Sequence, residues 1–286
     1  MNLGIFAKTF SRPTLDGVLD AVGSHGLQYV QFNMICAGLP SLPPAEIPAQ
    51  VAQEIGRAFA ARGLVMAALS GTFNMIHPDL KERREGLRRL DLLAGAAQAL
   101  GTSVITLCTG TRDPENMWRA HSENASGEAW HDLVQSLETA LESARRHRVT
   151  LAIEPEVGNV MDTAAKARAL LDHFRTPHLK AIMDPANLFH AGELIRMREL
   201  IDEAFEQLGN HIVLAHAKDL NADGDAGQEA AGTGVLDYDL YLANLRRVGY
   251  AGPLILHSLA EDQVERSLSF LRGKIYSPLQ SHGDCR

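Results

Sequence analysis

The sequence predicts a single (β/α)8 barrel, and three observations support this fold. The chain has 286 residues, which is long enough for one barrel of this kind. Eight short β-rich runs alternate with eight helical patterns along the chain. The fingerprint G-x-G-x-x-G, which would indicate a doubly wound dinucleotide-binding sheet, is absent after the first strand. We therefore expect parallel strands that close into a cylinder.

The expected strands are short runs rich in apolar and β-branched residues. They span residues 3–10, 27–33, 64–70, 103–109, 150–154, 179–184, 212–217 and 253–258. A buried strand followed by a helix, repeated, produces parallel strands that all point the same way.

The expected helices lie between these strands. They span residues 14–25, 45–62, 80–100, 128–147, 163–173, 193–208, 238–248 and 261–272. The helices expected at 45–62, 80–100 and 238–248 are each followed directly by a glycine. Gly101, for example, stands where a residue in the left-handed conformation commonly ends a helix. Asp162, Thr163 and Asp237 precede apolar-periodic runs and are the expected N-caps.

We expect one domain over residues 1–273, followed by a loose tail over residues 274–286. Two long connections, residues 109–127 and 221–234, follow predicted strands. Connections in this position lie on the catalytic face of a barrel and can act as lids.

Charge argues against a nucleic-acid partner. The formal net charge is −8, whereas a nucleic-acid-binding protein needs a basic face. Hydrophobic residues make up 45% of the chain, which is ample for a globular core. We therefore expect a small-molecule partner, and association into a homo-oligomer stays open.

The cysteines and the N-terminus predict a cytoplasmic location. The three cysteines, Cys36, Cys108 and Cys285, show neither C-x-x-C spacing nor a disulfide framework, which fits a reducing compartment. We find no signal peptide pattern and no apolar stretch long enough to cross a membrane.

Four apolar runs each end on a side chain that can bind a metal. These residues are Glu154, Asp184, His216 and His257, separated by 30, 32 and 41 residues, about one strand-plus-helix unit each. Since parallel strands end at the same rim of a barrel, the four side chains should converge there. Two oxygen and two nitrogen donors predict one divalent metal; Mn²⁺ is the first choice, and Zn²⁺, Co²⁺ and Fe²⁺ are the alternatives.

Each of these residues also has a purely structural interpretation. Asp184 fits an Asx-turn or a helix cap, and a single histidine after an apolar run is usually a core residue. The regular placement of all four favours the metal site.

Further candidates lie at strand ends and in the following loops. His77 is a candidate general acid, and the candidate substrate-binding residues are Lys218, Asn187, Glu156, Arg112, Trp118 and His121.

At these positions the chain resembles the sugar isomerase/epimerase superfamily, the xylose isomerase-like TIM barrels. The motifs are Leu-Ala-Ile-Glu154-Pro-Glu156, Met-Asp184-Pro-Ala-Asn187-Leu, His216-Ala-Lys218-Asp219 and Gly232-Thr-Gly-Val-Leu-Asp237-Tyr. The resemblance implies one divalent metal held by glutamate, aspartate, histidine and a final glutamate. The first three ligands carry over to Glu154, Asp184 and His216. His257 stands where the ketose 3-epimerases have the final glutamate, so their pair of acid/base glutamates does not carry over.

These observations predict metal-assisted proton abstraction next to the carbonyl of a sugar, sugar phosphate or sugar acid, through an enediolate. Glu154 is the expected ligand and base, and His257 or His77 is expected to return the proton. The product would be an isomer or an epimer. Three alternatives stay open: a lyase or dehydratase acting on a keto-polyol at the same site, a phosphodiesterase of the endonuclease IV type, and a non-catalytic sugar sensor.

Overall fold

The computed structural model describes residues 1–276, and within them eight parallel strands close into a barrel. The strands are β1 (Leu3–Phe6), β2 (Tyr29–Phe32), β3 (Val65–Ser70), β4 (Val104–Leu107), β5 (Thr150–Ile153), β6 (Leu179–Met183), β7 (Ile212–Asp219) and β9 (Leu254–Leu256). The β6–β7 and β1–β9 pairings complete the cylinder. The predicted (β/α)8 fold is confirmed.

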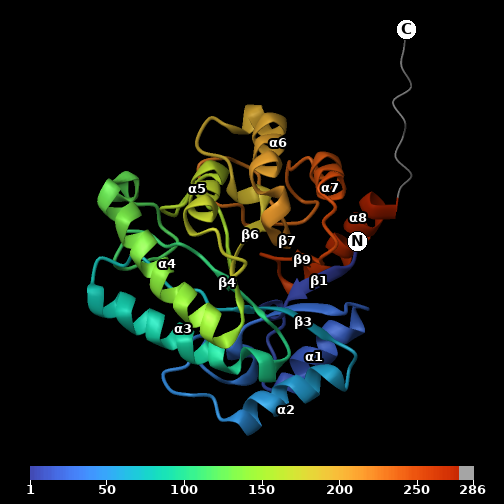
Figure 1. Ribbon diagram of the computed structural model, residues 1–286. Coiled ribbons are helices and arrows are strands. Elements are labelled where there is room, and N and C mark those ends of the chain that lie inside the picture. The colour runs from blue at the N-terminus through green and yellow to red at the C-terminus, as the bar shows by residue number, and fades with distance from the viewer. Residues whose placement is uncertain (277–286) are drawn as a thin grey trace.

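Eight α-helices in the described part of the chain surround the strands (Figure 1). They are α1 (Leu15–Ser24), α2 (Ala49–Ala60), α3 (Leu80–Leu100), α4 (Gly127–His147), α5 (Ala164–Phe174), α6 (Met197–Leu208), α7 (Tyr238–Arg247) and α8 (Val264–Tyr276). Helix α8 continues through the first three residues of the expected tail, and the rest of that tail lies outside the described residues. None of the described helices is both long and apolar enough to span a bilayer.

Several element ends differ from the expectation. Strand β1 ends at Phe6 because the chain turns into a short 3-10 helix at Ala7–Thr9. Helix α2 starts at Ala49 rather than near residue 45, since Pro48 occupies the N-cap and proline disfavours helix in the residue before it. A short strand, β8 (Glu229–Ala230), pairs antiparallel with the end of β7 inside a segment predicted to be a loop.

Two of the three expected N-caps are confirmed. Thr163 accepts a hydrogen bond from the amide of Lys166, and Asp237 accepts one from the amide of Leu240. Asp162 instead forms an ion pair with Lys166 at 2.9 Å. Gly101 ends α3 with φ of 97°, a left-handed conformation that suits glycine.

A small cluster of five buried residues fills the barrel, separate from the larger core between strands and helices. Its members are Ala68, Ala152, Ile182, Leu214 and Ile255. Side chains alternate between the two faces of a strand. A residue two positions beyond each cluster member therefore also faces the barrel axis, one layer closer to the carboxyl rim.

Candidate metal centre and cavity

The four predicted ligands stand above the residues that fill the barrel. Glu154, Asp184, His216 and His257 each follow a member of the interior cluster by two positions, so all four face the axis at the carboxyl end. The apolar cluster lies one layer beneath them. The fold therefore brings together polar side chains that are about one hundred residues apart in sequence.

Three of these side chains form one compact group. Within the described residues, one ligand atom from each of Glu154, Asp184 and His216 lies within 4.8 Å of the others. Nδ1 of His216 is 3.4 Å from Oε1 of Glu154 and 3.5 Å from Oδ2 of Asp184. Two carboxylates and one imidazole are able to hold a divalent ion.

Two buried atoms of this group have no hydrogen-bond partner in the described structure. They are Oδ2 of Asp184 and Nδ1 of His216. The other ring nitrogen of His216, Nε2, lies 2.9 Å from Oε1 of Gln31, which holds the ring so that Nδ1 faces the acids. Both atoms take part in ion pairs of 3.2 to 3.5 Å, but as atoms orphaned of a hydrogen bond they fit a site that holds a cation.

The opposite charges in this group stabilise the ionised forms of its side chains. Burial by itself would lower the pKa of His216, but Glu154 and Asp184 outweigh it and raise that pKa to about 9. Burial would raise the pKa of Asp184, but Lys218 and then His216 outweigh it and hold that pKa well below its ordinary range. In the absence of an ion, a protonated His216 and the ammonium of Lys218 therefore balance the charges of Glu154 and Asp184.

The fourth predicted ligand, His257, lies beside the group rather than in it. Its ring stacks on that of His216, with centroids 4.7 Å apart, and on Phe6, with centroids 4.8 Å apart. Nδ1 of His257 is 3.1 Å from Oγ of Ser258. Burial, and next the charge of His216, lower the pKa of His257 well below its ordinary value. Its role as a ligand stays a prediction.

Lys218 and Asn187 join the acids into one network. Nζ of Lys218 lies 3.2 Å from Oδ2 of Asp184 and donates to Oδ1 of Asn187 at 2.6 Å. The amide nitrogen of Asn187 donates to Oε1 of Glu154 at 2.7 Å. Glu156 is buried next to this network, and burial, followed by the charge of Glu154, raises its pKa to about 7. Asn159 donates to Glu156 at 3.2 Å.

A cavity of about 720 Å³ opens above these residues. Glu154, Glu156, Asn187, His216, Lys218 and His257 line one part of it. Uncharged polar residues that follow or belong to β2, β3 and β4 line another part. They are Gln31, Asn33, Ser70, Thr72 and Thr106. Oγ1 of Thr106 is buried and has no partner in the described structure. The cavity thus combines a charged floor with a wall of hydroxyls and amides.

The loop candidates lie in different places. Trp118 lines the cavity and is 54% exposed. Arg112 is buried in an ion pair with Asp132 at 2.5 Å, outside the cavity lining. His77 borders a smaller depression beside α3 and lies 3.1 Å from the carbonyl of Pro114. His121 caps a short 3-10 helix by accepting from the amide of Glu123.

Gln31 and Thr106 are two of the cavity residues that the sequence did not predict; Asn33, Ser70 and Thr72 are others. Gln31 and Thr106 are both polar residues inside predicted buried strands, 27–33 and 103–109, where an apolar side chain would otherwise be expected. A polar residue within a buried strand was the feature of the sequence that could have identified them. The sequence does not give the hydrogen-bond partner of Gln31, because Gln31 contacts His216 only once the barrel closes.

Comparison with known proteins agrees with this geometry. Residues 19–274 match the xylose isomerase-like TIM barrel family. The chain is 27% identical over 179 residues to L-ribulose-5-phosphate 3-epimerase UlaE of Escherichia coli O1:K1 / APEC. That match covers 63% of this chain and 58% of the epimerase, so it spans less than two thirds of the relative.

Solved structures support the fold. The D-tagatose 3-epimerase-like protein superposes with a TM-score of 0.74 at 15% identity, covering 96% of this chain and 97% of that one. The IolI protein with a bound zinc atom superposes with a TM-score of 0.72 at 17% identity, covering 96% and 98%. At these identities the similarity establishes the architecture.

Proposed function

This chain belongs to the xylose isomerase-like TIM barrel family, and from that premise we propose that it is a divalent-metal-dependent isomerase or epimerase. Its substrate would be a sugar, sugar phosphate or sugar acid. The observation that carries the proposal is the convergence of Glu154, Asp184 and His216, with two orphaned polar atoms, on the floor of a polar cavity. A sugar epimerase among the sequence relatives supports the same reaction class.

Glu154, Asp184 and His216 would hold the ion, with Mn²⁺ the first choice and Zn²⁺, Co²⁺ or Fe²⁺ the alternatives. When bound, it would supply Lewis acidity that polarises the substrate carbonyl. Gln31 would keep Nδ1 of His216 directed at that position. We include His257 in the proposal as a fourth ligand or as a proton donor, since its ring lies against that of His216.

Glu154 is the proposed base that removes the proton next to the carbonyl. The amide of Asn187 donates to its Oε1 and thereby fixes the direction of the carboxylate. Lys218 would stabilise the negative charge that develops on the substrate oxygen, because its ammonium is buried on the charged floor of the cavity. His77, Arg112 and His121 have no role in the proposal, since they lie outside the cavity lining.

The uncharged wall would bind the hydroxyl groups of the substrate. Thr106 is the clearest contributor, because its buried hydroxyl has no partner among the described residues and a sugar hydroxyl could supply one. Glu156 also lines the cavity and would bind a hydroxyl. These residues line the same cavity as the candidate ligands, so a sugar held there could bind the ion and the uncharged side chains together.

Deuterium exchange tests the proposal. The metal-loaded protein would be incubated in D2O with a panel of ketoses, ketose phosphates and keto sugar acids, and followed by NMR. We expect deuterium to enter at the carbon next to the carbonyl. The products would distinguish an isomer or epimer from the dehydrated compound that a lyase would form.

The Glu154→Gln variant supplies the mechanistic test. It keeps an oxygen for Asn187 but loses the base, so exchange should fall by at least about a hundredfold. Glu206→Gln, an equivalent change at an exposed position on α6, is the matched control. Undiminished exchange in Glu154→Gln would remove Glu154 from the mechanism. No exchange with any member of the panel would overturn the proposed reaction.

A further inference from the structure

The cavity is larger than a single sugar requires. A hexose has roughly a dozen non-hydrogen atoms, and even at the full ~30 Å³ share of a water molecule for each, it occupies at most about 360 Å³. The cavity measures about 720 Å³. Half of it would therefore remain after a hexose had reached the metal-binding floor.

The exposed lining residues mark the mouth of the cavity, and Trp118 is one of them, together with Lys8, Asp225 and Gln228. Trp118 lines the cavity yet is 54% exposed, whereas His216 on the floor is 2% exposed. The neighbouring Met117 also lines the cavity. A large apolar side chain half open to water beside a ligand cavity is a surface suited to a ligand ring.

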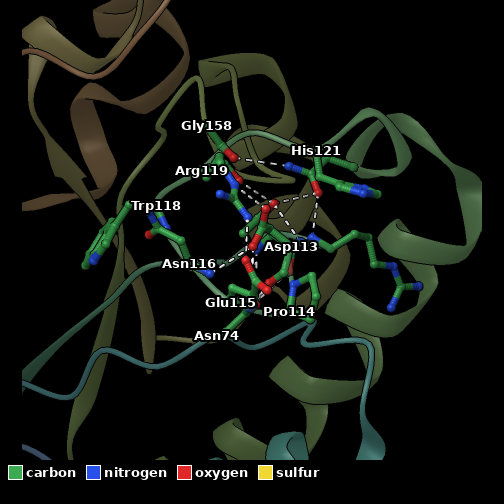
Figure 2. A network of polar contacts seen from close by, with 12 residues as sticks. Asn74, Asp113, Pro114, Glu115, Asn116, Trp118, Arg119, His121 and Gly158 are labelled. Carbon is green, nitrogen blue, oxygen red and sulfur yellow. Dashed lines mark hydrogen bonds and ion pairs between the residues drawn. The ribbon is translucent and has the colours of Figure 1, made fainter.

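The loop that carries Trp118 is held rigidly. Asp113 accepts hydrogen bonds from the amides of Glu115 and Asn116, at 2.9 and 2.8 Å. The side chain of Asn116 accepts from the amide of Trp118 at 3.0 Å, and Arg119 pairs with Asp113 at 2.5 Å. Figure 2 shows Trp118 projecting from one side of this network and His121 from the other. The backbone is therefore tied down on both sides of the indole.

The same loop is anchored to the barrel next to Glu156. The hydroxyl of Thr111 donates to the carbonyl of Arg119 at 2.9 Å, and the amide of Asn124 donates to the carbonyl of Gly158 at 3.1 Å. A side chain at Gly158 would begin 3.1 Å from the carbonyl of Trp118, so glycine lets the two segments pack closely. The backbone at Trp118 is thus held in place before any ligand arrives, which reduces the entropy of the loop that would be lost on binding.

We propose that Trp118 and Met117 form a second subsite, and that the substrate is a keto sugar joined to a second sugar ring by a glycosidic bond. The inference rests on the proposed function, which places the reacting sugar on the floor. The apolar face of the second ring would lie on the indole. Trp118 and Met117 carry no charge and suit the apolar face of a neutral ring. Lys8 and Asp225 also line the cavity, so fructose 6-phosphate is the ligand that distinguishes a phosphate from a second ring.

The protein provides its own reporter for this subsite. The chain has two tryptophans, and the conservative Trp130→Phe change leaves Trp118 as the only indole. This variant, loaded with Zn²⁺, would be titrated with fructose, fructose 6-phosphate and two keto disaccharides, maltulose and palatinose. We expect the tighter keto disaccharide to shift the emission of Trp118 and to bind at least about tenfold more tightly than fructose.

Trp118→Ala, measured by calorimetry in the otherwise unchanged chain, should reduce the ratio of disaccharide to fructose affinity to about one. Trp118→Tyr should restore most of it. Binding needs no turnover, so the outcome is separate from that of the exchange experiment. Three results would overturn the subsite. The first is equal affinity for fructose and both disaccharides, including no binding of any of them, and the second is tighter binding of fructose 6-phosphate than of the disaccharides. The third is a Trp118 emission that shifts with protein concentration in the absence of ligand, which would assign Trp118 to a contact between copies of the chain.

Discussion

Nδ1 of His216 and Oδ2 of Asp184 face each other across 3.5 Å, and neither atom has a hydrogen-bond partner among the described residues. Oδ2 of Asp184 is nevertheless ion-paired, because Nζ of Lys218 lies 3.2 Å from it and keeps the carboxylate ionised. An ionised carboxylate and a ring nitrogen directed at the same point are features that a cation site requires.

Asp184→Asn should weaken metal binding strongly. The change removes one negative charge and leaves an amide where a ligand oxygen was, so we expect affinity to fall by at least about a hundredfold. Titration with Zn²⁺ against a competing chelator measures this. Asp225→Asn, the same change at an exposed position by the cavity mouth, is the control and should retain the affinity of the unchanged chain. Equal loss in both variants would mean that charge alone, rather than coordination, attracts the ion.

Metal affinity should rise with pH. In the ion-free protein the folded-state pKa of His216 is about 9, above its ordinary value of 6.5. The protonated ring therefore contributes its full stabilisation of the fold below pH 6.5, and this contribution is lost as the pH rises through 9. A metal binds only the neutral ring. Between pH 6.5 and 8.5 we therefore expect affinity to increase by roughly tenfold per unit, with about one proton released per ion. Calorimetry in two buffers of different ionisation enthalpy counts that proton, and a pH-independent affinity would contradict the charge state assigned to His216.

Glu156→Gln should stabilise the ion-free protein at neutral pH. The pKa of Glu156 is about 7 in the folded state and 4.5 ordinarily, so between these values the folded chain binds more protons than the unfolded chain. The contribution of Glu156 to the free energy of unfolding is therefore greatest below pH 4.5. It declines as the pH rises to 7, by as much as ~3 kcal/mol. Urea unfolding at pH 5 and pH 8 in the presence of EDTA measures the free energy of unfolding. The advantage of Glu156→Gln should grow between the two pH values, whereas Glu206→Gln should show no such trend. An advantage that stays constant would indicate that Glu156 is ionised throughout.

Asp113→Ala should loosen the loop that carries Trp118. The change removes the acceptor for two backbone amides and the partner of Arg119, which are separate contacts worth on the order of 1 kcal/mol each. Limited trypsin digestion should then cleave after Arg119 several times faster. Glu115→Ala removes only the 3.3 Å contact of an exposed carboxylate with Arg119, so its cleavage rate should stay near that of the unchanged chain. Similar rates in both variants would show that the network does not hold the loop.

Much of the barrel could be predicted because its signals are local. An apolar run followed by a helical pattern is readable within about thirty residues, and each such unit packs on its neighbours in the same way. The strand-end position of Glu154, Asp184 and His216 follows from the run that precedes each one. The β8 strand was missed because two residues of a hairpin carry no periodicity, and their pairing with Lys218 and Asp219 arises only where the chain folds back.

The sequence alone therefore determined the order of strands and helices, and it placed a set of candidate metal ligands at one rim, since both depend on neighbours along the chain. Only the tertiary structure decided which of those side chains meet. Barrel closure puts Gln31 against His216, and it stacks the ring of His257 on that of His216 outside the three-residue group. The loop paths direct Arg112 to Asp132 and Trp118 to the cavity. Side-chain direction at a rim depends on strands and loops that are distant in sequence, and a linear pattern does not contain that information.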